Sequence, residues 1–247
     1  GLRVVKTEVD SFGYVLSGNS IDPIRPDSSY TEFLPSFNLS YDVTDELKSR
    51  ASYSKTMTRP PLSSLAPSTS IDSSRLEGRK GNTELLPYTS NNFDVGLEWY
   101  FSEEALLSSA IFYKRIDSLI EDSVQVEQAT FRQQISNELV TAPISFVKPT
   151  NGTGAAVKGL EVSFQSPLTF ISDKLEHFGT MANFTYTESA AGFKNQNDVR
   201  STSLPGLSKN SMNAMFYFDN ETFDARIAYA WRSGYVSYFS ESKYQDR

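Results

Sequence analysis

The sequence has no cysteine and only one histidine. Without cysteine the chain can form no disulfide, no thiolate metal site and no cysteine nucleophile. The single imidazole, that of His177, excludes any site that needs two histidines, and a Ser-His-Asp triad would have to use it. We expect His177 to be a solvated turn residue. The acidic residues are scattered without EF-hand spacing. The sequence therefore predicts no metal site, no cofactor and no catalytic residue.

The chain is also short of positive charge, with 23 Lys plus Arg against 30 Asp plus Glu and a net charge of -7. A nucleic-acid binder normally needs a basic face, so we expect no nucleic-acid partner. No apolar run approaches the roughly 20 residues that a membrane-spanning helix needs. The first residues, Gly-Leu-Arg-Val-Val, are neither an initiator methionine nor a signal peptide, and we expect an excerpt or a processed chain.

Aromatic residues are abundant instead, with 13 Tyr, 17 Phe and 2 Trp, and they lie in runs of period-two alternation. In 33–43, for example, every odd position is apolar or aromatic, and serine, asparagine or aspartate fills most positions between. Successive side chains of a strand point to opposite faces, so such a run predicts a strand with one apolar and one polar face. The nine runs are 2–9, 33–43, 47–57, 91–101, 105–117, 156–166, 177–187, 211–219 and 223–232. We find no segment of convincing helical period.

The connections between these runs alternate between short and long. The short ones are 44–46, 102–104 and 220–222, with a somewhat longer turn at 167–176. The long polar ones are 10–32, 58–90, 118–155 and 188–210. Transmembrane barrels have short periplasmic turns and long extracellular loops, and compact soluble domains rarely have loops this long. Aromatic residues near the short turns suit the membrane interface. The pattern predicts an all-β, transmembrane, antiparallel up-and-down β-barrel in the cell outer membrane.

The main structural alternative is a soluble Greek-key protein with aromatic core strands. It is disfavoured because the alternation of loop lengths and the placement of the aromatic residues would both be coincidences. Bacterial single-chain barrels close with an even number of strands, whereas this chain has nine runs. An open sheet would leave unpaired edges in lipid. We therefore expect a fragment of about nine strands from a larger barrel, with the strand at 2–9 running outward.

Several motifs follow one another in order along the chain. Tyr-Ser-Lys-Thr-Met-Thr-Arg-Pro at 53–60 is followed by Gly-Asn-Thr-Glu-Leu-Leu-Pro-Tyr at 81–88, by Asn-Asn-Phe-Asp-Val-Gly-Leu-Glu-Trp-Tyr-Phe at 91–101 and by Lys-Gly-Leu-Glu-Val at 158–162. This succession resembles the barrel of TonB-dependent receptors. In that family an outward strand ends in an Arg-Pro loop, and a Gly-Asn-Pro-x-Leu-x-Pro segment leads into an aromatic-rich downward strand. Thr83 stands where the family usually has proline.

The resemblance implies that residues 1–247 are part of a receptor barrel of roughly 22 strands, without the plug domain and the closing strand. It implies TonB-coupled uptake of a bulky nutrient (an iron chelate, cobalamin or an oligosaccharide) and no enzymatic activity. The expected partners are the TonB complex, the receptor's own plug domain, a small-molecule ligand such as a siderophore or an oligosaccharide, and outer-membrane lipid. The functional alternative is a small autonomous outer-membrane barrel that acts as an enzyme, an adhesin or a passive porin.

Candidate ligand contacts lie in the long loops, where function concentrates. One loop carries Arg59, Arg75, Arg79 and Lys80. Clustered arginines suit an anionic siderophore through charge-assisted hydrogen bonds. The next loop carries Phe131, Arg132, Gln133 and Gln134, where an aromatic surface and polar donors suit a sugar.

The polar faces of the strands should line the lumen of the barrel. The charged residues expected there are Lys48, Arg50, Asp94, Glu98, Asp224 and Arg226. In a receptor barrel these side chains would contact the plug domain, the solvent of the lumen or the ligand.

The alternation of loops can be tested by placing one cysteine at Arg79 or at Glu103, because the chain has no cysteine of its own. In intact cells we expect an impermeant thiol reagent to label position 79, in a long outer loop, and to spare position 103, in a short periplasmic turn. Mass spectrometry of the purified protein measures the labelling. Labelling at both positions, or at 103 alone, would contradict the proposed orientation.

Overall fold

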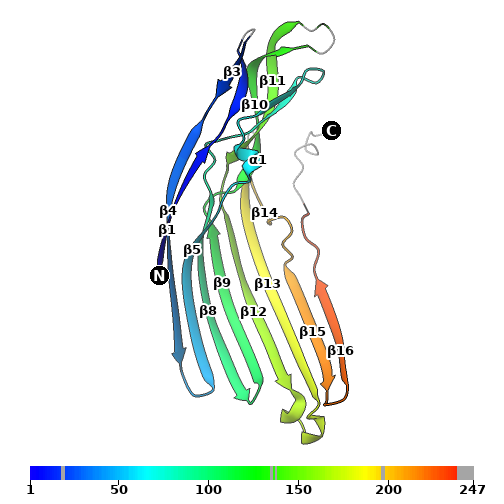
Figure 1. The fold of residues 1–247 in the computed structure, drawn as a ribbon. Coiled ribbons are helices and arrows are strands. Elements are labelled where there is room, and N and C mark those ends of the chain that lie inside the picture. Colours follow the sequence, from blue (N-terminus) through cyan, green and yellow to red (C-terminus); the bar gives the residue numbers. More distant parts are fainter. Residues whose placement is uncertain (18–19, 134–135, 137, 196–197, 238–247) are drawn as a thin grey trace.

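The computed structural model describes residues 1–17, 20–133, 136, 138–195 and 198–237. One curved antiparallel sheet runs through the chain as a wall (Figure 1), in the strand order β1-β4-β5-β8-β9-β12-β13-β15-β16. Its strands are β1 (Leu2–Asp10), β4 (Asp27–Asp42), β5 (Leu47–Thr58), β8 (Tyr88–Ser102), β9 (Ala105–Ile116), β12 (Ala155–Pro167), β13 (Phe178–Asn195), β15 (Asn210–Asp219) and β16 (Asp224–Arg232). A short strand, β14 (Asp198–Thr202), also pairs with β13. The nine strands of the main path confirm the nine runs of the sequence, and each pairs with its neighbours along the chain.

Several strands are longer than their sequence runs. β4 has 16 residues, β8 has 15 and β13 has 18. A tilted strand needs about 9–11 residues to cross the hydrocarbon layer. The short turns gather at one end of the wall and the long connections at the other (Figure 1). These strands therefore extend beyond the hydrocarbon layer, and the long connections begin outside it.

The two faces of the wall differ in polarity, as the alternation predicts. On β8 the side chains of Phe93, Val95 and Leu97 are about half exposed, although all three are large and apolar. Phe93 lies opposite Tyr53 on β5 and Tyr113 on β9, so its row continues across three strands. Extended rows of exposed apolar side chains mark an interaction surface. We call this side the outward face and the opposite, polar side the inward face.

Helices contribute little to the fold. Among the described residues they are α1 (Leu62–Leu65) and two 3-10 turns, η1 (Leu168–Phe170) and η2 (Asp173–Leu175). No helix in the described part of the chain combines the length and the apolar character needed to cross a membrane.

The long connections, which were predicted to be polar loops, contain regular structure. β10 (Ile120–Arg132) and β11 (Leu139–Asn151) form a hairpin paired over all their residues. β7 (Glu77–Lys80) pairs parallel with β11, and β6 (Thr69–Asp72) pairs antiparallel with β7. The result is a four-stranded outer sheet, β10-β11-β7-β6, above the wall. A separate hairpin joins β2 (Gly13–Ser17) and β3 (Ser20–Ile24).

The outer sheet has a small apolar core of its own. Phe131, Ile144 and Phe146 are 7%, 0% and 0% exposed and pack together, with Ile71, Ala129 and Ala142 around them. Gly78 allows this packing, because a Cβ there would lie 2.4 Å from Cε1 of Phe146. The alternation of Val140, Ala142, Ile144 and Phe146 with polar or proline residues was the sequence signal for β11.

Two asparagines tie the connections to one another. Asn82 donates from Nδ2 to the carbonyl of Pro149 (2.9 Å), and its backbone N–H donates to the carbonyl of Ser64 (2.7 Å). The Asn151 side chain accepts from the N–H of Leu86 (2.9 Å) and donates to the carbonyl of the same residue (3.1 Å). The Gly-Asn-x-x-Leu-x-Pro segment at 81–87 therefore joins the β5–β8 and β9–β12 connections.

The polarity of the two faces can be tested with one arginine on each. Ile111 lies on the outward face of β9 and is 59% exposed, whereas its neighbour Ala110 lies on the inward face opposite Glu161. We expect Ile111→Arg to lower the free energy of unfolding by about 2–4 kcal/mol, because the arginine would face hydrocarbon. Ala110→Arg should cost less than about 1 kcal/mol, because it faces a polar lumen. Denaturant unfolding of the complete protein in bilayers measures both, and equal losses would contradict the assignment of the faces.

The asparagine contact can be tested by Asn151→Ala. This change removes both hydrogen bonds to Leu86, and we expect local destabilisation of about 1–3 kcal/mol. Hydrogen exchange of residues 83–88 should become faster while that of the wall stays unchanged. Asn38→Ala on β4, whose side chain has no hydrogen bond to a described residue, is the matched control. Unchanged exchange at 83–88 would show that the contact does not hold the two connections together.

Candidate ligand-binding site

The β6–β7 hairpin presents two of the arginines expected to bind ligand. Arg75 and Arg79 are both exposed. The Arg75 Nε atom lies 3.8 Å from Oδ2 of Asp72, a loose ion pair. Hydrogen bonds from the hydroxyl and the backbone N–H of Ser74 lower the pKa of Asp72, so this carboxylate stays ionised beside Arg75. The guanidinium of Arg79 forms no ion pair or hydrogen bond with another described residue, which leaves it available to an anion.

Lys80 is held in place, unlike Arg79. Its ammonium group pairs with Glu127 of β10 and lies 4.0 Å from the ring centre of Phe146. Neighbouring residues of a strand point to opposite faces, so Lys80 points toward the core of the outer sheet and Arg79 away from it. The ammonium group of Lys80 therefore stabilises the outer sheet through its contacts with Glu127 and Phe146.

The other predicted arginines belong to other parts of the chain. Arg59 follows β5, and its Nε donates to Oγ1 of Thr7 on β1 (3.3 Å). Arg79 lies opposite Val147 on β11, whereas Arg132 lies opposite Leu139 on the same strand. Eight residues of strand at about 3.3 Å each place these two arginines roughly 25 Å apart. The structure thus places Arg75 and Arg79 on one hairpin, separates Arg132 from Arg79 and places Arg59 beside β1.

The expectation of an aromatic surface at Phe131 is wrong. Its ring is only 7% exposed and packs against Ile144 and Phe146, so it supports the outer sheet and offers no face to a sugar. Arg132 and Gln133 are exposed at the end of the β10–β11 hairpin. The side-chain carbonyl of Gln133 accepts from the hydroxyl of Ser136 (3.2 Å). Gln134 lies outside the described residues.

The charged residues expected to face the lumen all lie on the inward face, in the same rows as its polar side chains. Lys48 and Glu98 are register partners, and Asp94 lies opposite Ser52. Most are paired with one another or with neighbours. The ion pairs are Arg50–Glu98 (2.7 Å), Lys48–Asp42 (3.3 Å) and Arg226–Asp224 (2.7 Å). The hydroxyl of Ser52 donates to Asp94 (3.2 Å). This face therefore carries both signs of charge, largely compensated locally.

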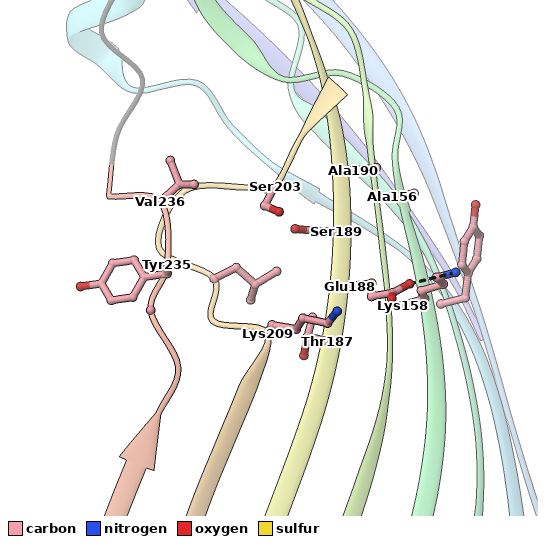
Figure 2. Close-up of a pocket in the computed structure, with 13 residues that line it drawn as sticks. Ala156, Lys158, Thr187, Glu188, Ser189, Ala190, Ser203, Lys209, Tyr235 and Val236 are labelled. Carbon is pink, nitrogen blue, oxygen red and sulfur yellow. Dashed lines mark ion pairs between the residues drawn. The ribbon is translucent and has the colours of Figure 1, made fainter. Parts of the chain in front are cut away.

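A hollow of about 680 Å³ lies near the outer end of β12 and β13 (Figure 2). Lys158 and Glu188 form an ion pair across these strands at 3.2 Å. Lys209 and Tyr235 line the hollow from the β15 side. Lys158 is the register partner of both Tyr113 and Glu188, so this ion pair lies on the outward face of the wall. The Lys158–Glu188 pair therefore lies on the side opposite the polar inward face.

The described residues contain no cluster of three or more histidine or acidic side chains that could hold a metal ion. His177, at the β12–β13 turn, is half-exposed and lies 3.5 Å from Glu176 and edge-on to the ring of Phe218.

Comparison with solved structures shows the same fold in three receptors. A mutant of the ferric enterobactin receptor PfeA from Pseudomonas aeruginosa, in complex with enterobactin, is 20% identical, with a TM-score of 0.62 over 86% of this chain and 30% of that one. The siderophore receptor PirA from Acinetobacter baumannii is 15% identical, with a TM-score of 0.63 over 93% and 33%. The ferric citrate transporter FecA, unliganded, is 12% identical, with a TM-score of 0.56 over 85% and 27%.

The chain thus spans about a third of the length of these receptors, which fits nine strands of a larger barrel. Among curated protein sequences nothing matches the chain. The profile of the TonB-dependent receptor-like β-barrel matches residues 1–247, which is the whole sequence. Barrels of this family lie in the outer membrane and belong to receptors, not to enzymes. The chain is a member of the TonB-dependent receptor β-barrel family.

Proposed function

We propose that this chain is part of the barrel wall of an outer-membrane receptor that binds a ferric chelate and imports it with energy from the TonB complex. The observation that carries the proposal is the match of the family over residues 1–247. The receptors for ferric enterobactin and other siderophores, and the ferric citrate transporter, have the same fold. The substrate class is inferred from these relatives together with the chemistry of the outer sheet.

The outer sheet supports an anionic ligand better than a neutral sugar. Arg75 and Arg79 stand exposed on a hairpin whose other cation, Lys80, is already paired. Guanidinium groups form strong, directional hydrogen bonds with carboxylate and other anionic oxygens. The aromatic ring that would have favoured a sugar, Phe131, is buried. A ferric chelate with negatively charged oxygens would match the groups that remain accessible.

The inward face suits a lumen occupied by a plug domain, which we propose the complete receptor supplies. Its charges are paired in the wall, as in Arg50–Glu98. A surface of compensated charges and hydroxyls can pack against a polar domain without leaving buried charges unpaired. Transport would then need the plug to move, which is the step that TonB would drive.

The proposal predicts that Arg75→Ala and Arg79→Ala weaken binding of a ferric siderophore to the full receptor. Each lost charge-assisted hydrogen bond costs about 1.5–3 kcal/mol, which corresponds to about a ten- to hundredfold higher Kd. Calorimetric titration with a panel of ferric siderophores, ferric citrate, cobalamin and oligosaccharides measures the effect and identifies the ligand class.

Lys174→Ala, in the periplasmic-side turn, is the matched control because it removes one exposed cation far from the outer sheet. Its affinity should equal that of the unsubstituted receptor. Tight binding of an oligosaccharide or cobalamin with no binding of any iron chelate would contradict the proposed substrate class. Chelate binding that is unaffected by both arginine substitutions would place the ligand site elsewhere.

A further inference from the structure

One of the four short connections differs in composition from the others. The connections β4–β5, β8–β9 and β15–β16 contain Asp45 and Glu46, Glu103 and Glu104, and Glu221, respectively. The β12–β13 connection begins with Leu-Thr-Phe-Ile at 168–171 and only then becomes polar, with Ser-Asp-Lys at 172–174. Acidic tips are expected in water, whereas an apolar tip needs another environment.

The structure gives this connection two halves (Figure 1). The first is η1 (Leu168–Phe170), followed by Ile171, and the side chains of Phe170 and Ile171 are 51% and 62% exposed. The second is η2 (Asp173–Leu175), whose N-cap Ser172 accepts from the N–H of Lys174. Asp173 and Lys174 are exposed as well. The turn is therefore amphipathic along its length, with apolar and charged side chains both outside the protein core.

The apolar half continues the outward face of the wall. The ring of Phe170 packs edge-on against Phe101, with the ring centres 5.9 Å apart. Phe101 also stacks on Phe164 at 6.1 Å and lies 5.3 Å from Trp99. Leu107 is the register partner of both Trp99 and Phe164, so these two rings share the outward face with Phe93 and Val95. Phe170 thus extends the outward aromatic row past the end of β12.

We propose that residues 168–171 form a membrane-interface anchor that inserts Phe170 and Ile171 among the phospholipids of the periplasmic leaflet. The occupant follows from continuity, since the row that Phe170 extends is the lipid-facing surface of an outer-membrane barrel. Aromatic side chains are favoured at the headgroup level, where ring and backbone meet apolar and polar surroundings at once. The charged half, from Asp173 to His177, lies in the periplasmic water. The anchor fixes the depth of the wall on this side of the barrel.

The test compares two positions of the same turn in the full receptor, with any cysteines elsewhere replaced by serine. Ile171→Cys and Asp173→Cys are each labelled with a polarity-sensitive fluorophore and reconstituted into vesicles of phosphatidylethanolamine and phosphatidylglycerol. Both side chains are exposed, so neither change removes packing from the core. Nitroxide-labelled lipid and aqueous iodide serve as the two quenchers. No chelate is present, so the outcome is independent of the proposed ligand.

We expect the label at position 171 to emit at shorter wavelength and to be quenched several-fold more by nitroxide lipid than the label at 173. Iodide should show the opposite preference. Quenching of position 171 by iodide as strong as at 173, with none by nitroxide lipid, would overturn the proposal. It would mean that Ile171 faces water or a periplasmic protein. Quenching of both positions by lipid would overturn the division of the turn into an inserted and a hydrated half.

Discussion

The structure depends on one constraint, that backbone N–H and C=O groups inside a hydrocarbon layer must pair with other backbone groups. The nine strands of the main path satisfy it by continuous antiparallel pairing from β1 to β16. Because the backbone is satisfied by its neighbours, the side chains are free to match two different environments. Phe93, Val95 and Leu97 face outward, while Asp94 and Glu98 on the same strand face inward.

The outer sheet is stabilised differently, because it lies where water can satisfy exposed backbone groups. Its stability comes from the buried core around Phe146, from the Lys80–Glu127 pair and from the two asparagine contacts. A parallel contact between β7 and β11 joins two connections that are far apart in the sequence. The exposed arginines Arg75 and Arg79 thus belong to a hairpin that is held by strand pairing and by a buried core.

Adjacent cations on one strand illustrate how this support selects the groups that could bind a ligand. Arg79 and Lys80 are neighbours in sequence, yet only Lys80 points to the core face and is paired there. Because successive side chains of a strand point to opposite faces, Arg79 points to solvent. In the sequence both residues are simply positive charges in one loop. In the structure Lys80 is paired within the outer sheet, whereas Arg79 has no ion pair with a described residue.

The sequence by itself determined the wall. Its nine strands, their inward and outward faces and the short-turn end follow from local alternation, since side-chain direction in a strand depends only on position along it. The family followed from the order of motifs such as Gly-Asn-Thr-Glu-Leu-Leu-Pro. Only the tertiary structure decided the outer sheet, the burial of Phe131 and the separation of Arg132 from Arg79. These depend on pairing between segments far apart in the chain, such as β7 with β11, and no local pattern specifies which distant strand or side chain a segment will meet.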